Sequence, residues 1–197
     1  MPYSTFFPKK SSTSHIDFHK FVDEELSKRG FKIVLITEKL MKGRLHDFRA
    51  FVNGIRNEYR ELYNWKEENE EYFLNGLVDK WKYSFSIMNG NEGIFFVNFS
   101  SVYRDIIHNH CTYAHKKTRG LNFAKLHMIK ICQTGLDNGF RCQEGYWPKS
   151  NNRSIILFLK MGWQIESMRK GTELFMKADL EKVRNQTYEL IINEQKN

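Results

Sequence analysis

Two histidines near the middle of the chain are the residues whose types and spacing could do acid–base chemistry. His108 and His110 lie two positions apart in an apolar stretch, residues 106–114, whose composition is typical of a β-strand. Because side chains alternate along a strand, both imidazoles are expected on the same face of a sheet. Imidazole titrates near neutrality, so either ring could accept a proton from a bound substrate.

The histidines are followed by a basic turn and the start of a helix. Lys116, Lys117 and Arg119 come directly after the predicted strand, and residues 121–136 then form an apolar stretch that predicts a helix. The first N–H groups of a helix have no partner within it, and the helix dipole adds about half a positive charge there. The sequence therefore predicts an anion site, suited to phosphate, close to two bases.

This turn resembles a known family signature. The segment Arg119-Gly120-Leu121-Asn122-Phe123-Ala124 is similar to Q/R-x-x-G-x-G/A, the pyrophosphate-binding signature of the GNAT superfamily of acyl-CoA-dependent N-acyltransferases. It matches at Arg119 and Ala124 and departs at Asn122, where the family has glycine. Asparagine tolerates positive φ better than most residues, so the departure is mild if the turn needs that conformation.

A second resemblance to the same family lies downstream. Residues 151–163, from Asn151 through Phe158, Lys160 and Gly162, are similar to N-x-x-A-x-x-x-Y-x-K-x-G-F. The two motifs occur in the family's order and together cover roughly the C-terminal half of the chain. The main departure is Phe158, where the family frequently has a tyrosine.

The resemblance implies a fold and a reaction. The fold would be α/β (α+β mixed) and GNAT-like, with a central, mostly antiparallel mixed sheet of six to seven strands, splayed between strands four and five and flanked by helices. The reaction would be transfer of an acetyl group from acetyl-CoA to a primary amine, by direct attack in a ternary complex. Acetyl-CoA would lie in the gap between the splayed strands, with its thioester beside a β-bulge.

Positions for acetyl-CoA follow from the two motifs. Backbone groups of Thr112, Tyr113 and Ala114 would meet the acetyl and pantetheine portions, and residues 119–125 would hold the diphosphate. The complete expected set is Thr112, Tyr113, Ala114, Lys117, Arg119, Gly120, Leu121, Asn122, Phe123, Ala124, Lys125, Asn151 and Phe158.

The resemblance also assigns catalytic roles. The family often has a glutamate at the position of His108, and arylalkylamine N-acetyltransferases similarly carry histidine at both histidine positions. His108 and His110 would take the proton of the amine, and the N–H near Ala114 would polarise the carbonyl. Because Phe158 cannot protonate the leaving thiolate, water, Tyr146 or Tyr113 would do so. The alternative is that both histidines are structural.

A metal site is not expected. Cys111 and His115 are close to the two histidines in the sequence, but Cys111 should point to the opposite face of the strand, and no paired-ligand spacing is present.

Composition limits the partners and the compartment. The chain has 197 residues and a net charge of +8, which suits a polyanion such as a nucleotide cofactor, an acidic acyl carrier protein or nucleic acid. Its three cysteines form no CxxC pair, which indicates a reducing compartment. No apolar run reaches the roughly 20 residues of a membrane helix, so we expect a cytoplasmic protein without a membrane partner, either monomer or homodimer.

The elements that must position these residues are expected in one domain, 1–197. It divides into an N-terminal extension and helix (1–30), a first strand with acceptor-side helices (31–80), a CoA-binding core (81–176) and a C-terminal tail (177–197). Helices are expected at 15–29, 45–62, 121–136 and from 151 or 152 to 162, and strands at 31–36, 81–88, 93–103, 106–114, 140–147, 163–168 and 172–176. Residues 1–14 should be irregular, and residues from 193 onward loose.

Three other functions remain open at this point. The donor could be a longer acyl-CoA or an acyl carrier protein. The chain could be a basic nucleic-acid-binding module without catalysis, or a CoA-binding protein that has lost catalysis. The acceptor cannot be read from the sequence.

Overall fold

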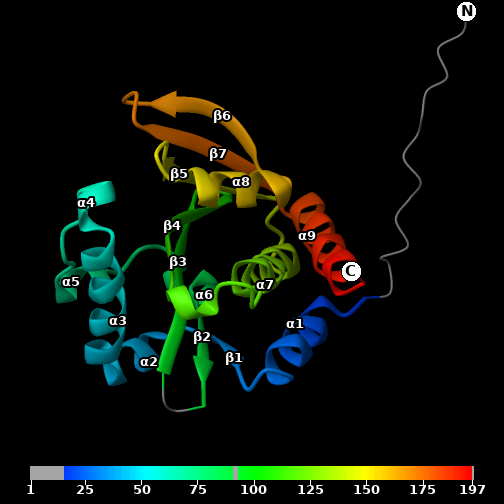
Figure 1. Ribbon diagram of the computed structural model, residues 1–197, viewed down its shortest axis with the longest axis horizontal. Helices are drawn as coiled ribbons and strands as arrows, with labels where there is room; N and C mark the ends of the chain where they lie inside the picture. Colours follow the sequence, from blue (N-terminus) through cyan, green and yellow to red (C-terminus); the bar gives the residue numbers. More distant parts are fainter. Residues whose placement is uncertain (1–15, 91–92, 197) are drawn as a thin grey trace, which may run out of the picture.

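A seven-stranded mixed sheet forms the centre of the computed structural model, which describes residues 16–90 and 93–196 (Figure 1). Its strand order is β1-β2-β3-β4-β5-β7-β6. The strands are β1 (Lys32–Leu35), β2 (Phe85–Asn89), β3 (Gly93–Tyr103), β4 (Ile106–Ala114), β5 (Cys142–Pro148), β6 (Gln164–Arg169) and β7 (Glu173–Asp179).

The sheet is antiparallel except at one place. Only β4 and β5 run parallel, and their pairing is limited to residues 107–109 of β4 with residues 143–145 of β5. The rest of β4 stays paired with β3, while the rest of β5 stays paired with β7. The two strands therefore part after Asn109 and Gly145, which confirms the splay expected between strands four and five.

A β-bulge interrupts β4 where it parts from β5. Phe99 pairs with Cys111 and Ser100 pairs with Asn109, so His110 is an extra residue on β4. A bulge of this kind bends the strand and shifts the alternation of side chains beyond it. The Asn98 side-chain amide holds the bulge, because its Nδ2 donates to Asn109 Oδ1 (2.5 Å) and to the Cys111 carbonyl oxygen (3.1 Å).

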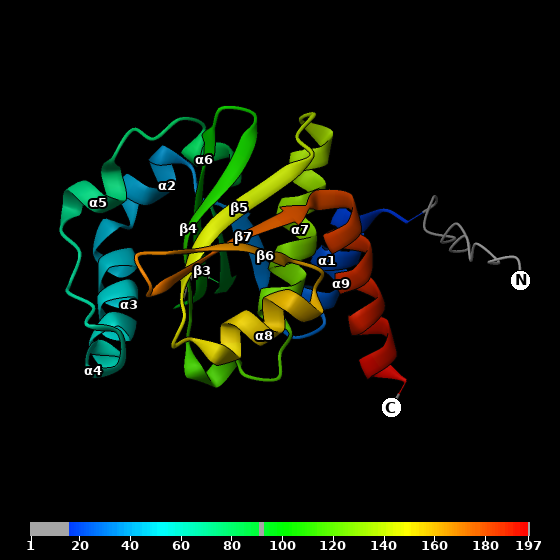
Figure 2. The ribbon, with the colours of Figure 1, turned by 90° about the horizontal axis from the view of Figure 1, so that it is seen from above.

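Helices cover both faces of the sheet (Figures 1 and 2). One face carries α1, α7 and α9, and the other carries α2, α3 and α5. The helices are α1 (Phe18–Ser27), α2 (Glu38–Gly43), α3 (Leu45–Glu58), α4 (Arg60–Tyr63), α5 (Glu70–Leu74), α6 (Lys80–Tyr83), α7 (Phe123–Asp137), α8 (Asn152–Lys160) and α9 (Leu180–Gln195), with a 3-10 turn at Lys116–Thr118.

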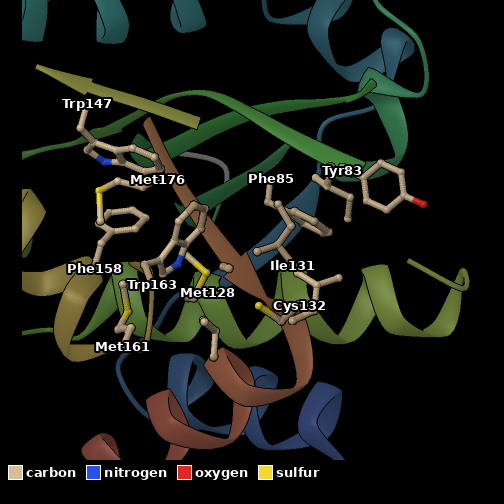
Figure 3. Packing of buried hydrophobic residues seen from close by; sticks show 14 of the residues in the cluster. Tyr83, Phe85, Met128, Ile131, Cys132, Trp147, Phe158, Met161, Trp163 and Met176 are labelled. Atoms are coloured by element: carbon tan, nitrogen blue, oxygen red, sulfur yellow. The ribbon is translucent and has the colours of Figure 1, made fainter. Parts of the chain in front are cut away.

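The helix α7 lies centrally, as its apolar circumference predicts. Met128, Ile131 and Cys132 pack toward the sheet beside Phe85 and the aromatic side chains near α8 (Figure 3). Phe123, Leu126 and Ile129 belong to a second cluster with α1 and α9. A third cluster joins α2, α3 and α5 to the opposite face through Val97, Phe99 and Tyr113.

Several expected boundaries are wrong. The predicted strand 81–88 is a helical turn, α6, followed by the shorter β2. A strand would place Trp81 and Tyr83 on one face, but the helical turn sends Trp81 to the cluster on one face of the sheet and Tyr83 to the cluster on the other. The predicted helix 45–62 divides into α3 and α4, and α2 was not separately expected.

The C-terminal segment is not a tail. β7 continues to Asp179, whose side chain accepts a hydrogen bond from Lys182 N (2.8 Å) and so caps α9. Leu180, Val183 and Ile191 of α9 are buried. The expectations for residues 1–14 and for Asn91 in the turn after β2 lie outside the described residues.

None of the helices in the described part of the chain combines the length and the apolarity needed to cross a bilayer.

Candidate active site

The corner between β4 and α7 presents the backbone amides that precede the hydrogen-bond ladder of the helix. The first i-to-i−4 hydrogen bond at this helix end is from Leu126 N to the Asn122 carbonyl oxygen (2.9 Å), so the amides of residues 123–125 precede the helical ladder. Gly120 and Asn122 have φ of 82° and 58°. The positive φ at Asn122 explains why asparagine can replace the glycine of the family signature.

Contacts from α1 and α9 hold this corner in place. Arg29 Nη1 of α1 donates to the Leu121 carbonyl oxygen (2.7 Å). The Lys125 ammonium pairs with the Glu194 carboxylate of α9 and lies 3.2 Å from Asn122 Oδ1. Lys125 was expected to meet the diphosphate, but its charge is already paired, so its backbone N–H is the group that remains at the corner.

A cleft of about 950 Å³ runs from this corner along the parted strands. Most of the expected site residues line it, namely His110, Thr112, Tyr113, Ala114, Arg119, Gly120, Asn122, Phe123, Ala124, Lys125, Tyr146, Asn151 and Phe158. Arg153 and Lys160 of α8 also line the cleft and add two cations to it. Lys160 belongs to the second motif but was not expected at the site, and no sequence signal indicated Arg153.

Three expected residues are absent from the lining that the described residues form. Lys117 lies in the 3-10 turn, where its N–H is held by His115 Nδ1 (3.1 Å) and its side chain is exposed. Leu121 packs into the apolar cluster with α1. His108 lies one step behind the bulge, on the paired part of β4.

His110 presents its imidazole to the cleft from the bulge. Its Nε2 lies 2.6 Å from Ser101 Oγ of β3, and its ring centroid is 4.9 Å from that of His108. The two rings therefore share a face, as predicted. Burial, followed by the neighbouring His108 and Lys80, lowers the pKa of His110 to about 4, so its ring is neutral at pH 7.

His108 joins His110 to β5. Its Nδ1 lies 3.2 Å from Glu144 Oε1, because His108 and Glu144 are register partners in the short parallel ladder. Its ring centroid is 5.9 Å from that of Tyr146, which lies at the first position of β5 beyond its pairing with β4. No sequence signal indicated Glu144, since the register of a parallel pair is decided by tertiary packing.

Arg56, Tyr72, Cys111 and Tyr113 add further polar groups to the lining of the cleft. The Tyr72 hydroxyl lies 2.8 Å from Cys111 Sγ, and Arg56 Nη1 donates to the Tyr113 hydroxyl (2.7 Å). Burial raises the pKa of both tyrosine hydroxyls and raises that of the Cys111 thiol to about 11, so all three stay protonated at neutral pH.

The expected orientation of Cys111 is wrong. The bulge at His110 shifts the alternation, so Cys111 packs with Phe99 and Tyr113 on the face that also carries the two histidines. Within the described residues, no three side chains of His, Cys, Asp or Glu come together as possible metal ligands.

Lys80 is a buried cation close to this site. The residue is 3% exposed. Its Nζ donates to the Phe73 carbonyl oxygen (2.8 Å) and to Asn75 Oδ1 (3.1 Å), and it lies 5.3 Å from the centre of the Phe99 ring. Burial lowers the pKa of this ammonium to about 8. The sequence indicated nothing here, because Lys80 lies in an ordinary polar segment.

Phe158 is part of the hydrophobic core as well as a wall of the cleft. Its ring centroid lies 4.8 Å from that of Trp147 and 5.2 Å from that of Trp163, and its side chain is buried (Figure 3). At the position where the family frequently has a tyrosine, this chain therefore has a phenylalanine that packs against two tryptophans. Of the two tyrosines considered as substitutes, Tyr146 and Tyr113, Tyr113 already holds Arg56.

The chain is similar to known proteins in structure but not in sequence. No protein-family model and no curated protein sequence matches the chain. The PaiA N-acetyltransferase of Thermoplasma acidophilum, solved in complex with coenzyme A, superposes with a TM-score of 0.60 at 12% identity, covering 76% of this chain and 98% of that one.

Two further solved structures are similar. A GNAT-family acetyltransferase from Staphylococcus aureus has a TM-score of 0.59 at 11% identity, covering 76% of this chain and 99% of that one. YncA of Salmonella typhimurium, a putative acetyltransferase solved with acetyl-CoA, has a TM-score of 0.54 at 13% identity, covering 77% and 94%. The chain, with its sheet parted between β4 and β5, thus shares the fold of these acetyltransferases.

Proposed function

We propose that the protein is an N-acetyltransferase that transfers the acetyl group of acetyl-CoA to a primary amine. The observation that carries this proposal is a single cleft that contains both the backbone amides before α7 and the neutral imidazole of His110. An anion-binding corner and a base in one cleft suit a substrate with a phosphate end and a reactive end.

The chain's own groups fit acetyl-CoA. The amides of residues 123–125, Arg119 and the helix dipole suit a diphosphate, and Arg153 and Lys160 suit further phosphate. The parted strands leave backbone groups of Thr112, Tyr113 and Ala114 without a β5 partner, so they can bind the amide groups of the pantetheine arm. Acetyl-CoA, when bound, supplies the acetyl group as a thioester.

His110 acts as the base in this proposal. A proton on Nε2, donated to Ser101 Oγ, leaves Nδ1 free to accept a proton from the acceptor ammonium. His108, held by Glu144, positions the ring of His110. Tyr146 is the hydroxyl we assign to protonation of the leaving sulfur, since it lines the cleft beside His108.

The first test is release of free thiol from acetyl-CoA over a panel of primary amines. His110→Ala should lower kcat by about 100-fold or more, as expected for loss of a general base, with the affinity for CoA in calorimetry unchanged. His46→Ala is the matched control, because the His46 side chain is 97% exposed on α3. Full activity of His110→Ala would contradict the role of His110, and absence of thiol release with every amine would contradict the proposed function.

A further inference from the structure

The last helix, α9, contacts α8, the corner before α7 and α1 (Figure 1). Gln186 Nε2 donates to the Lys160 carbonyl oxygen at the end of α8 (2.9 Å). Glu194 contacts the corner, and Gln195 Nε2 donates to Glu25 Oε2 of α1 (2.9 Å). Lys160 and the corner both line the cleft. One helix thus joins the elements around the place where the diphosphate is expected.

The Glu194 carboxylate makes the direct contact with the corner. Lys125 Nζ lies 2.5 Å from Glu194 Oε2, and Asn122 Nδ2 donates to the same oxygen (3.2 Å). Lys125 Nζ also donates to Asn122 Oδ1 (3.2 Å), so the three side chains form a closed set of hydrogen bonds. The hydrogen bond from Lys125 lowers the pKa of the Glu194 carboxyl, so this group is ionised at neutral pH. The contact is therefore charge-assisted and stronger than one between neutral groups.

Asn122 is the residue whose backbone conformation orients the amides that follow it. Its φ of 58° is left-handed, and this conformation costs a residue with a Cβ about 1 kcal/mol relative to glycine. The glycine of the family signature has no side chain, whereas Asn122 has one that Glu194 and Lys125 hold. The contact with Glu194 therefore offsets the cost of the conformation that the corner needs.

The helix α1 holds the same turn at the preceding residue. Arg29 Nη1 donates to the Leu121 carbonyl oxygen (2.7 Å). Glu25, which is 6% exposed, accepts from Gln195 with the same oxygen that lies 3.9 Å from Arg29 Nη2. The last turn of α9 thus contacts the corner directly through Glu194, and indirectly through Gln195 and α1.

Glu194 reaches the corner from outside the cleft. Asn122 and Lys125 belong to the lining that the described residues form, and Glu194 does not. Its side chain is 50% exposed. Because a diphosphate on the amides of residues 123–125 would lie on the cleft side, the carboxylate supports the corner from behind and does not compete with the ligand.

We propose that Glu194 is a positioning residue for the donor, an inference that rests on the acetyl transfer proposed above. Through Asn122 and Lys125 it holds the amides of residues 123–125 in the orientation that binds a diphosphate. Without the carboxylate, part of the binding free energy of the donor is spent on ordering these amides. The donor then binds more weakly, whereas the reacting groups on β4 and β5 keep their arrangement.

The test compares donors with and without a diphosphate. Thiol release by the parent and by Glu194→Ala is measured with acetyl-CoA and with S-acetylpantetheine, which has the same thioester but no phosphate, and the affinity for CoA is measured by calorimetry. In the variant, KM for acetyl-CoA and Kd for CoA should rise about tenfold, with kcat nearly unchanged and kcat/KM for S-acetylpantetheine unaffected.

The outcomes separate this inference from the proposed function. Unchanged or tighter CoA binding by folded Glu194→Ala overturns the inference and leaves acetyl transfer standing, and so does an equal loss of kcat/KM with both donors. Absence of both CoA binding and thiol release in the parent overturns the two together. Glu189→Ala is the matched control, since Glu189 is an exposed glutamate on the same helix and lies outside the lining of the cleft that the described residues form.

A double-mutant cycle with Asn122→Gly tests the route through Asn122. Glycine adopts positive φ without support, so in that background Glu194→Ala should weaken CoA binding by only about threefold or less. The same tenfold loss in both backgrounds contradicts a role through Asn122. If Glu194→Ala fails to fold, Glu194→Gln takes its place: it keeps an acceptor oxygen but no charge, and should weaken CoA binding about threefold. No loss in that variant contradicts the proposal.

Discussion

His110 and His127 are both kept neutral by burial, but only His110 reaches the cleft. His127 lies on α7 between Phe85 and Phe96, with ring centroids 6.2 and 5.0 Å away, and is 2% exposed. Its Nε2 has no hydrogen-bond partner among the described residues. His110 is thus a candidate base, whereas His127 is a core residue that packs between two phenylalanines.

Burial of His127 predicts acid sensitivity of the fold. Burial lowers the pKa of its imidazole to about 3, whereas an unfolded histidine has a pKa of about 6.5. Between these values the unfolded chain binds more protons, so the free energy of unfolding falls as the pH falls. The contribution of His127 to this loss is about 2 kcal/mol between pH 7 and pH 5.

Replacement by an aromatic residue should remove this contribution. His127→Phe should lose less stability than the parent between pH 7 and pH 5, by about 2 kcal/mol in urea unfolding. Comparison of the two proteins at each pH cancels the other titrating groups. An equal loss of stability in both would show that His127 is protonated in the folded state.

At the scale of elements, the point where β4 and β5 part requires a close approach of the two strands. Gly145 is the last residue of β5 that pairs with β4, and a Cβ there would lie 2.9 Å from the Asn109 carbonyl oxygen and 2.9 Å from the Trp147 ring. We expect Gly145→Ala to destabilise the fold by about 1–3 kcal/mol and to weaken CoA binding, because β5 must move away from β4. Denaturant unfolding and calorimetry measure the two effects.

A glycine in open space provides the control for this change. Gly54 lies within α3, and a Cβ there would meet no atom within 4 Å. Gly54→Ala should therefore stabilise the protein by about 0.5–1 kcal/mol, through the higher helix propensity of alanine. If Gly145→Ala stabilised the protein as Gly54→Ala is expected to, then β4 and β5 would have space for a Cβ, which the structure does not show.

The turn before α7 makes a second prediction at this scale. Asn122 has φ of 58°, where a β-branched residue costs about 1–2 kcal/mol. Asn122→Val should lower the melting temperature and weaken CoA binding, while Asn122→Gly, which restores the family signature, should preserve both or improve them. Equal CoA affinity for the two variants would mean that the backbone conformation of this turn does not affect CoA binding.

At the scale of the whole molecule, cations gather along the cleft. Lys116, Arg119, Arg153 and Lys160 line it, and the acidic residues of its lining are Glu68 and Glu173. Within a net charge of +8 this local excess of cations suits a diphosphate. The position of these cations favours a nucleotide cofactor over an acyl carrier protein or a nucleic acid, which the net charge also allows.

Salt should therefore weaken CoA binding moderately. Between 50 and 500 mM NaCl we expect the affinity for CoA in calorimetry to fall about fivefold, because exposed cations are screened while backbone amides are not. A nucleic-acid-binding protein would instead bind DNA with a steep salt dependence and ignore CoA. Strong DNA binding together with no CoA binding would favour that alternative over the proposed function.

The sequence by itself determined the parts that depend on local chemistry. The shared face of His108 and His110, the basic turn and the apolar character of α7 are properties of neighbouring residues, and each was predicted. The tolerance of asparagine for positive φ was noted, and the structure shows that Asn122 has that conformation. The helix α9 could also have been found, since Leu180, Val183, Thr187 and Ile191 have helical spacing and Asp179 is a good cap.

Only the tertiary structure decided the rest. His110 is an extra residue in β4 without a partner on β3, and it places Cys111 on the face of the histidines. No pattern in this sequence distinguishes a strand with a bulge from a regular strand. The parallel register that brings Glu144 to His108, and the loop that carries Trp65 to Tyr113, join residues far apart in the chain. Such contacts depend on how whole elements pack, because the free energy that selects them comes from burial of many side chains together.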